Sequence, residues 1–357
     1  METSQIAIVR FSALGDLILC SSAVQSLANQ LPNTQILWIT STLSQKLFEF
    51  PGNVIVQLID KPSTLRSYYE FWSQHKAKRY ECILAMQASL RINLLYPLLR
   101  SKHKIGFDRT RARDGHALFT HERIPTAHGH LLDGFYQFLE PLKHHFPDTN
   151  INATPTDSWP ILTDYKADQE AKERLESSER WIAIAPCASK SERDWPTHCF
   201  EECILSLLLE YNDVNLVLVG GRTEKEQHIG QHLMQKLPPH AGKRVLNTIG
   251  TTTLPQLSSI LKQCDALIAP DTGPVHLARA LKIPVVGLYA VARPELTGPY
   301  KATEFCVNKY PAAVETYLGY SYEMAKWHTR VHHPKAMSLI TVNEVLQQVA
   351  NALNFHL

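Results

Sequence analysis

The sequence lacks the signals that mark exported, membrane-spanning and dinucleotide-binding proteins. Its start carries no basic stretch, and the apolar run from Ile6 ends at Arg10, which is too short for a signal peptide. No apolar stretch approaches the roughly 18 residues of a membrane span, so we expect a cytoplasmic protein. The glycine fingerprint Gly-x-Gly-x-x-Gly is also absent, which weakens the hypothesis of an NAD-dependent oxidoreductase.

Sequence patterns for disulfides and metal sites are missing as well. The seven cysteines are odd in number, scattered and without a Cys-x-x-Cys pair, so we interpret them as reduced thiols. No Asp-x-Asp motif occurs. We therefore predict neither a bound metal nor a cofactor.

The chain is long enough for two domains. Single cores rarely grow past about 250 residues, and this chain has 357. A composition with 44% hydrophobic and 20% charged residues is typical of a globular enzyme rather than a disordered chain. Runs rich in β-formers alternate with amphipathic stretches, which predicts α/β domains whose parallel sheets are covered by helices on both faces.

The expected elements form two series, separated by a polar segment at 147–160 that we interpret as a linker. The first series has strands at 6–11, 36–40, 54–58 and 82–86 and helices at 17–31, 68–72 and 90–99. The second has strands at 181–185, 215–219, 266–269 and 285–289. We therefore predict domains of residues 1–150 and 151–340, followed by a C-terminal helix at 341–357.

Positive charge is concentrated in one part of the first half. Residues 61–123 contain 13 Lys or Arg against 5 Asp or Glu, a net charge of +8, whereas the whole chain carries only +2. Such a basic region predicts an anionic partner. The alternative is a set of solvated helix faces with no partner.

Asp16 is the first candidate functional residue. It lies in the stretch Phe11-Ser-Ala-Leu-Gly-Asp16, which follows the first expected strand and opens the first expected helix. In an open parallel sheet the carboxyl end of a strand faces the ligand crevice, so we expect the Asp16 carboxylate to project into it. The alternative is that Asp16 only caps its helix.

A second candidate site lies within residues 269–289. This segment has the pattern of a strand, a turn formed by Asp271, Thr272 and Gly273, a short helix and another strand. The exposed N-terminus of such a helix is suited to binding a diphosphate. His276, in the first helical turn, is placed to reach the same ligand. The alternative is a strand-helix-strand crossover without a ligand, which would not require Asp271, Thr272 and His276 to occur together.

Two further loops carry polar side chains after expected strands. Lys190 and Arg193 lie in the loop that follows the strand at 181–185, where a leaving diphosphate needs its charge neutralised; a solvated loop is the alternative. Glu224 follows the strand at 215–219. Its carboxylate is suited to bind ribose hydroxyls, and a helix cap is the competing interpretation.

Together the motifs resemble those of a known family, the bacterial lipopolysaccharide core heptosyltransferases, ADP-heptose-dependent enzymes of glycosyltransferase family 9. The resemblance rests on Arg10-Phe-Ser-Ala-Leu-Gly-Asp16, on Asp271-Thr-Gly-Pro-Val-His276-Leu-Ala, and on Pro294-Glu-Leu-Thr-Gly-Pro-Tyr300, in this order and at this spacing. It implies the GT-B fold, in which two Rossmann-like parallel-sheet domains face a central cleft.

The resemblance also implies an activity and roles for residues. The chain would be an inverting glycosyltransferase that moves heptose from ADP-heptose to the Kdo/heptose inner core of lipopolysaccharide. Asp16 would be the general base, and Asp271, Thr272, Gly273 and His276 would bind the donor's diphosphate and sugar. Lys190 or Arg193 would neutralise the departing ADP.

The expected acceptor is the phosphorylated lipid A core on the inner face of the inner membrane, which implies a peripheral membrane association and no nucleic-acid partner. Its anionic groups would bind basic residues of the first half, which we expect to be Lys61, Arg66, Lys102, Lys104, Arg109, Arg111 and Arg113.

The chain departs from the family's pattern at three points. Pro186-Cys187 stands where the family often has Pro-Gly, and Arg193 where it usually has Lys. Tyr289-Ala290 replaces the family's Phe-Gly, so the loop at 291–293 and the sugar pocket are expected to differ in shape. Two alternatives therefore stay open: a GT-B transferase for another nucleotide sugar, and a non-catalytic nucleotide-sugar-binding protein, which would have no need of Asp16.

Overall fold

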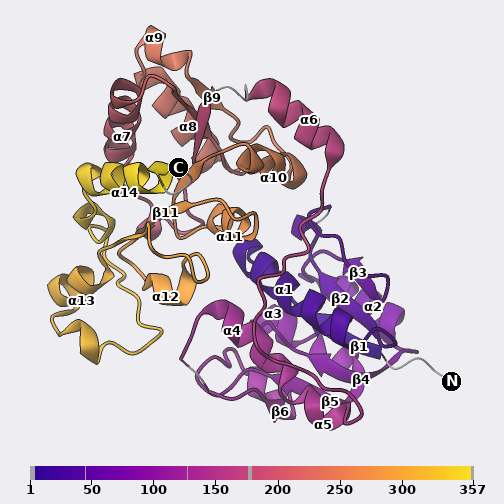
Figure 1. Ribbon diagram of the computed structural model, residues 1–357. Helices are drawn as coiled ribbons and strands as arrows, with labels where there is room; N and C mark the ends of the chain where they lie inside the picture. Colours follow the sequence, from indigo (N-terminus) through magenta and orange to yellow (C-terminus); the bar gives the residue numbers. More distant parts are fainter. Residues whose placement is uncertain (1–4, 45, 127, 176–178, 355–357) are drawn as a thin grey trace. The chain divides into compact units, whose positions relative to one another are not determined.

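The computed structural model describes residues 5–44, 46–126, 128–175 and 179–354. The chain forms two compact units, Met1–Ile161 and Leu162–Leu357. Each unit contains one six-stranded sheet whose strands all run parallel, and helices cover the sheets (Figure 1). The predicted α/β class with two parallel sheets is confirmed.

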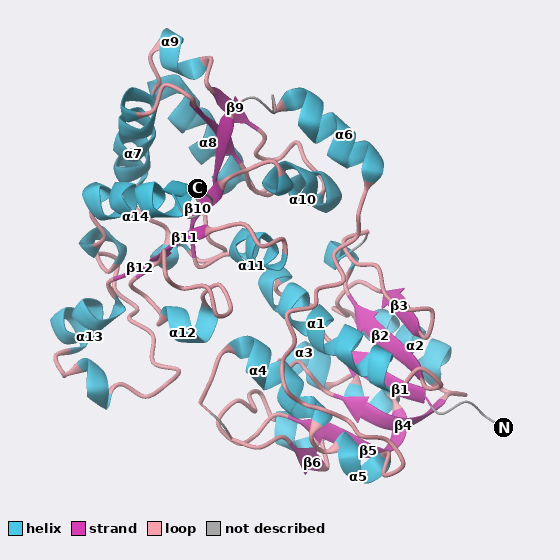
Figure 2. Cartoon of the chain, in the orientation of Figure 1, coloured by secondary structure: helices cyan, strands magenta, loops and turns pink. Residues whose placement is uncertain are grey.

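The sheet of the first unit has the strand order β3-β2-β1-β4-β5-β6 (Figure 2). Its strands are β1 Gln5–Val9, β2 Gln35–Thr40, β3 Val54–Leu58, β4 Arg79–Leu84, β5 Arg100–Gly106 and β6 Glu122–Arg123. Its α-helices are α1 Leu14–Gln30, α2 Leu65–His75, α3 Leu90–Asn93, α4 Leu131–Tyr136 and α5 Leu142–His145. Four 3-10 turns, η1 to η4, are Thr42–Ser44, Tyr96–Leu98, His116–Leu118 and Gln137–Leu139.

The sequence of the first unit explains where the predicted strands and helices agree with the structure and where they differ. β1 is a nearly continuous apolar run that pairs with β2 on one side and β4 on the other, as a strand buried on both faces requires. The expected helix at 90–99 ends at Asn93 and resumes as the 3-10 turn η2. Pro97 lies in that turn, and it lacks the N–H that an α-helix would need there.

The second unit repeats this architecture with the strand order β12-β11-β10-β7-β8-β9. Its strands are β7 Arg180–Ile184, β8 Val214–Leu218, β9 Val245–Asn247, β10 Ala266–Pro270, β11 Val285–Tyr289 and β12 Val307–Asn308. Its α-helices are α6 Tyr165–Arg174, α7 Thr197–Glu210, α8 Glu224–Lys236, α9 Pro239–Gly242, α10 Leu254–Lys262, α11 Gly273–Ala280, α12 Pro294–Thr297, α13 Tyr310–Leu318 and α14 Val342–Asn354. Its 3-10 turns, η5 to η7, are Ser191–Arg193, Tyr322–Met324 and Met337–Leu339.

The structure shows where the expected linker at 147–160 and the expected C-terminal helix lie. Segment 147–160 packs on the first unit, where the Ser22 hydroxyl donates to the carbonyl of Ser158 (2.9 Å) and the Glu49 N–H to that of Pro160 (2.9 Å). The expected C-terminal helix is α14, and residues 355–357 lie outside the described residues. None of the helices in the described ranges has the length and apolar character that crossing a bilayer requires.

The strand orders determine where side chains can converge. In each sheet the chain winds outward in both directions from a central pair, β1 and β4 in the first unit and β7 and β10 in the second. The loops after such a pair diverge and leave a crevice at the carboxyl edge of the sheet, where α/β folds bind ligands. Asp16 follows β1, Arg193 follows β7 and Asp271 follows β10, so all three candidates lie at these switch points.

Candidate active site

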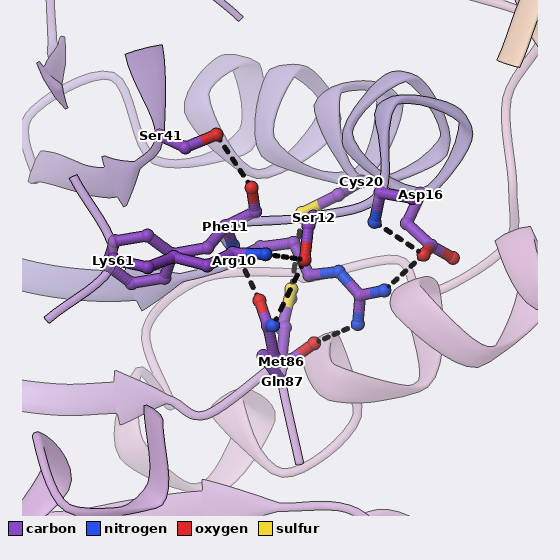
Figure 3. Close-up of polar contacts among 10 residues, drawn as sticks. Arg10, Phe11, Ser12, Asp16, Cys20, Ser41, Lys61, Met86 and Gln87 are labelled. Atoms are coloured by element: carbon purple, nitrogen blue, oxygen red, sulfur yellow. Dashed lines mark hydrogen bonds and ion pairs between the residues drawn. The ribbon is translucent and has the colours of Figure 1, made fainter. Parts of the chain in front are cut away.

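Asp16 lies in the first turn of α1, where one of its two carboxylate oxygens is engaged (Figure 3). Oδ2 lies 2.5 Å from Nη2 of Arg10 and accepts the N–H of Ala13 at 2.9 Å. Within the described part of the chain no hydrogen bond engages Oδ1, which Figure 3 shows directed away from Arg10. With 26% of the side chain exposed, the carboxylate caps α1 through one oxygen and presents the other to solvent.

The loop that carries Asp16 rests on Gln87, which follows β4. The side-chain carbonyl of Gln87 accepts the Phe11 N–H at 2.7 Å, and its own backbone carbonyl accepts the hydroxyl of Tyr96 at 2.7 Å. On the other side, the Ser41 hydroxyl donates to the Phe11 carbonyl at 2.7 Å (Figure 3). Side chains that follow the buried strands β2 and β4 therefore fix the backbone from which Asp16 projects.

Lys61 is the expected acceptor residue that the fold brings to this loop. Its ammonium donates to the hydroxyl of Ser12 at 2.5 Å, four residues before Asp16. Partial burial lowers the pKa of Lys61, and the charges of Arg10 and Arg91 lower it further. A concentration of positive charge therefore lies beside the Asp16 loop.

The remaining basic residues of the first unit divide into exposed and internal groups. Lys102, Arg109 and Arg113 are exposed. Lys104 is buried, donates to the carbonyl of Tyr96 at 2.7 Å, and has its pKa lowered by that burial. Its ammonium is committed inside the fold, so the surface charge comes from the exposed members.

Two other expected acceptor residues are held by acidic neighbours. Arg66 is exposed on α2 and pairs with Glu70 one turn later at 2.8 Å. Arg111 is half-buried, pairs with Asp108, and donates to the amide carbonyl of Gln137 at 2.6 Å. Arg111 thereby anchors the loop after β5, on which Arg109 and Arg113 stay exposed.

His116 fixes the far end of that loop as a neutral ring. The amide nitrogen of Asn93 donates to the carbonyls of Arg113 (3.2 Å) and Asp114 (2.9 Å), so its oxygen is free to accept from Nδ1 of His116 at 2.8 Å. Nε2 then accepts the N–H of Phe107 at 3.3 Å. Burial lowers the pKa of His116 to about 4, in agreement with a ring that needs an unprotonated Nε2.

In the second unit, Arg193 and Asp271 meet at the switch point. Nη1 of Arg193 lies 2.7 Å from Oδ2 of Asp271, and Nη2 donates to the hydroxyl of Ser189 at 2.7 Å. Arg330 lies 4.0 Å from the same Asp271 oxygen. Arg193 and Asp271, both predicted to bind the donor, are therefore in direct contact. Arg330 adds a cation that no sequence motif had indicated.

The turn after β10 delivers a helix N-terminus to the same place. Thr272 is the N-cap of α11, but its side chain accepts no hydrogen bond from the first turn. Gly273 is the first helical residue, and His276 is buried in that turn. The positive end of the α11 dipole therefore lies beside the Arg193–Asp271 pair, an arrangement suited to an anion.

Two of the predicted donor residues are exposed. Lys190 is exposed just before η5, and Glu224 is exposed at the start of α8. The N-cap of α8 is Thr223, and Glu226 completes the capping box, its carboxylate also accepting the N–H of Gly221 at 2.7 Å. Lys225 beside it pairs with Asp194. Glu224 is itself an acidic residue in the first turn of α8, so the alternative that it stabilises the helix N-terminus stays open.

Comparison with known proteins gives matches over most of the chain. The family model described as glycosyltransferase family 9 (heptosyltransferase) matches residues 68–352. The lipopolysaccharide core heptosyltransferase OpsX of Haemophilus influenzae is 28% identical over 345 residues, which cover 96% of this chain and 95% of the relative.

Solved structures have the same fold. Escherichia coli ADP-heptose LPS heptosyltransferase II aligns with a TM-score of 0.71 at 16% identity, covering 99% of each chain. E. coli heptosyltransferase WaaC with ADP-2-deoxy-2-fluoro heptose aligns with a TM-score of 0.64 at 18% identity, covering 97% of this chain and 99% of that one.

Proposed function

The chain belongs to glycosyltransferase family 9, the heptosyltransferase family, and on this premise we propose that it moves heptose from ADP-heptose onto the inner core of lipopolysaccharide. The observation that carries the proposal is the Asp16 carboxylate, held by Arg10 through one oxygen and open through the other. A nucleotide-sugar-binding protein without catalytic activity would have no need of such a base.

The second unit is the proposed donor domain. A diphosphate would bind at the N-terminus of α11, near Thr272 and Gly273, with Arg193 as its cationic contact. Charge-assisted contacts of this kind are short and strong. That a relative was solved with an ADP-heptose analogue supports ADP-heptose as the donor.

In the proposed reaction Asp16 takes the proton of an acceptor hydroxyl while that oxygen attacks the anomeric carbon of the heptose. The bond between this carbon and the diphosphate breaks, and ADP leaves with the electron pair and one more negative charge. Arg193 and the N–H groups at the start of α11 stabilise that charge. A single displacement inverts the anomeric configuration.

The first unit is the proposed acceptor domain, acting at an anionic membrane surface. Exposed leucines occur in the segments that follow β3, β4 and β5: Leu65 is 90% exposed, Leu90 59% and Leu118 82%. The exposed cations Arg66 and Arg91 each follow one of them directly. Apolar side chains interleaved with cations are suited to the interface of an anionic lipid layer, which supports a peripheral association.

A direct assay tests the proposal. The purified protein is incubated with ADP-heptose and with either Kdo-bearing lipid A or the same acceptor carrying one heptose, and the products are weighed by mass spectrometry. We expect one heptose to be added to one of the two acceptors, with release of one ADP. Transfer only from a different nucleotide sugar, or ADP binding without any transfer, would favour one of the two alternatives instead.

A further inference from the structure

A group of three ligand-type side chains lies at the β6 edge of the first sheet, apart from the residues assigned above. They are His103 on β5, Glu122 on β6 and His145 at the end of α5. Nδ1 of His103 lies 2.8 Å from Oε1 of Glu122, and Nε2 of His145 lies 2.9 Å from Oε2. The imidazole centroids are 3.9 Å apart. All three potential ligand atoms lie within 4.8 Å of one another.

We propose that these three residues, the His103–Glu122–His145 cluster, bind a divalent transition metal ion, with zinc as the ion that fits best. Two imidazole nitrogens and one carboxylate form a set of protein ligands typical of zinc sites that keep a fourth position open. Imidazole also suits copper, nickel and iron, whereas magnesium and calcium prefer oxygen ligands. The donor set therefore selects a transition metal.

The distances require only a small adjustment to hold an ion. Zinc binds nitrogen and oxygen at about 2.0 to 2.2 Å, so tetrahedral ligand atoms lie roughly 3.3 to 3.6 Å apart. The hydrogen-bonded atoms here are at 2.8 and 2.9 Å, roughly 0.4 to 0.8 Å closer than that. On binding, each histidine turns a lone pair to the ion, and the proton it shared with Glu122 moves to the other ring nitrogen or to solvent.

Burial gives the cluster a closed side and an open side. The side chain of His145 is 12% exposed, whereas those of His103 and Glu122 are 34% and 33% exposed. The ion would thus be held by three side chains from separate elements, with solvent supplying the fourth ligand.

The position of the cluster points to a structural role. β6 has only two residues and pairs with β5 through Ile105↔Glu122 and Gly106↔Arg123. An ion bound between His103, Glu122 and His145 would join β5, β6 and α5, and so stabilise the sheet edge. The cluster was not expected from the sequence, because its members are 19 and 23 residues apart and form none of the short metal-binding motifs.

Calorimetry on the full-length, tag-free protein, stripped with EDTA, tests this site. Zinc chloride is titrated at a pH about one unit above the ordinary histidine pKa of ~6.5. We expect one tight site per chain and a zinc-dependent rise in Tm. His103→Ala and His145→Ala should each weaken binding by more than the ~10- to 100-fold that loss of an outer-shell partner costs. His144→Ala, an exposed neighbour on α5, is the matched control and should bind zinc as the wild type does.

Cobalt gives a second readout that does not depend on the stability of the variants. Cobalt bound to the wild-type protein should show the intense visible absorption of a four-coordinate ion, and zinc should displace it. The proposal is overturned if the wild-type protein binds zinc no more tightly than the folded double variant His103→Ala/His145→Ala. It is equally overturned if bound cobalt shows only the weak bands of a hydrated ion.

Discussion

Arg10 joins the Asp16 carboxylate to the end of β4. Its Nη2 lies 2.5 Å from Oδ2 of Asp16, and its Nη1 donates to the carbonyl of Met86 at 2.7 Å (Figure 3). The planar guanidinium can make both contacts at once because its donors form a rigid fork. Arg10 therefore sets the direction of the carboxylate as well as balancing its charge.

Replacing Arg10 with Lys should keep the positive charge beside Asp16 but remove the paired contacts that orient its carboxylate. The single ammonium of Lys cannot hold both Asp16 and the Met86 carbonyl, so the carboxylate loses its fixed direction. We expect kcat to fall by about 10- to 100-fold, the scale of a misplaced catalytic group, while donor affinity stays the same. Steady-state kinetics and ADP titration check this, and an unchanged kcat would show that Arg10 does not position Asp16.

Arg193→Ala and His276→Ala should both weaken ADP binding. A hydrogen bond to a charged group contributes about 1.5 to 3 kcal/mol, so loss of the Arg193 contact should raise the Kd for ADP roughly 10- to 150-fold. Loss of Arg193 also leaves Asp271, which is 10% exposed, with Arg330 at 4.0 Å in place of its 2.7 Å ion pair, so Tm should fall. Lys236→Ala, an exposed cation on α8, is the control. Calorimetric affinities equal to wild type in both variants would place the diphosphate elsewhere.

Stability should decrease as the pH falls, in part through His116. The pKa of this buried ring is lowered from 6.5 to about 4 in the folded chain, so the unfolded chain binds more protons between these values. The stabilisation is complete above about pH 6.5 and is lost as the pH falls toward 4, by on the order of 1 to 2 kcal/mol down to pH ~5. Urea unfolding of wild type and His116→Gln, compared at about pH 7 and pH 5, measures the difference. Equal pH dependence in the two proteins would contradict this assignment.

Charge reversal on the exposed part of the basic stretch should affect the acceptor and not the donor. Arg109→Glu/Arg113→Glu is expected to raise the acceptor KM and leave ADP affinity unchanged, with each charge contributing about 1 kcal/mol near an anionic surface. Added salt should reproduce the effect, because exposed charges are screened beyond about 8 to 10 Å at physiological ionic strength. Lys236→Glu in the second unit is the control. If the acceptor KM responds neither to charge reversal nor to salt, Arg109 and Arg113 belong to a solvated surface that does not bind the acceptor.

The strands that could be predicted are those that carry an apolar run of several residues. The prediction at 285–289 agrees with β11 Val285–Tyr289, which is buried throughout, because apolar β-branched runs are typical of buried parallel strands. The prediction at 54–58 agrees with β3 Val54–Leu58 at the edge of its sheet, where β-branched residues favour a strand although Ile55 and Val56 are exposed. β5 was missed because its sequence, Arg-Ser-Lys-His-Lys-Ile-Gly, is mostly polar. β6 and β12 have two residues each, too few for any periodicity to be detected.

The candidate residues could be selected from the sequence, but not their partners. Arg193 and Asp271 are 78 residues apart, and their contact depends on β7 and β10 being neighbours in the sheet. Strand order is a property of the whole fold that local patterns do not contain. The same holds for Lys104, whose burial follows from its position on β5 and not from its charge.

The most direct test of the account is single-turnover transfer by Asp16→Asn. The amide can still accept from Ala13 and contact Arg10, so fold and ADP affinity should be preserved, as circular dichroism and calorimetry would show. Because the amide cannot take the proton of the acceptor hydroxyl, the rate of heptose transfer should fall by about two to four orders of magnitude. A variant that is folded, binds ADP and transfers the sugar at nearly the wild-type rate would contradict the assignment of Asp16 as the general base.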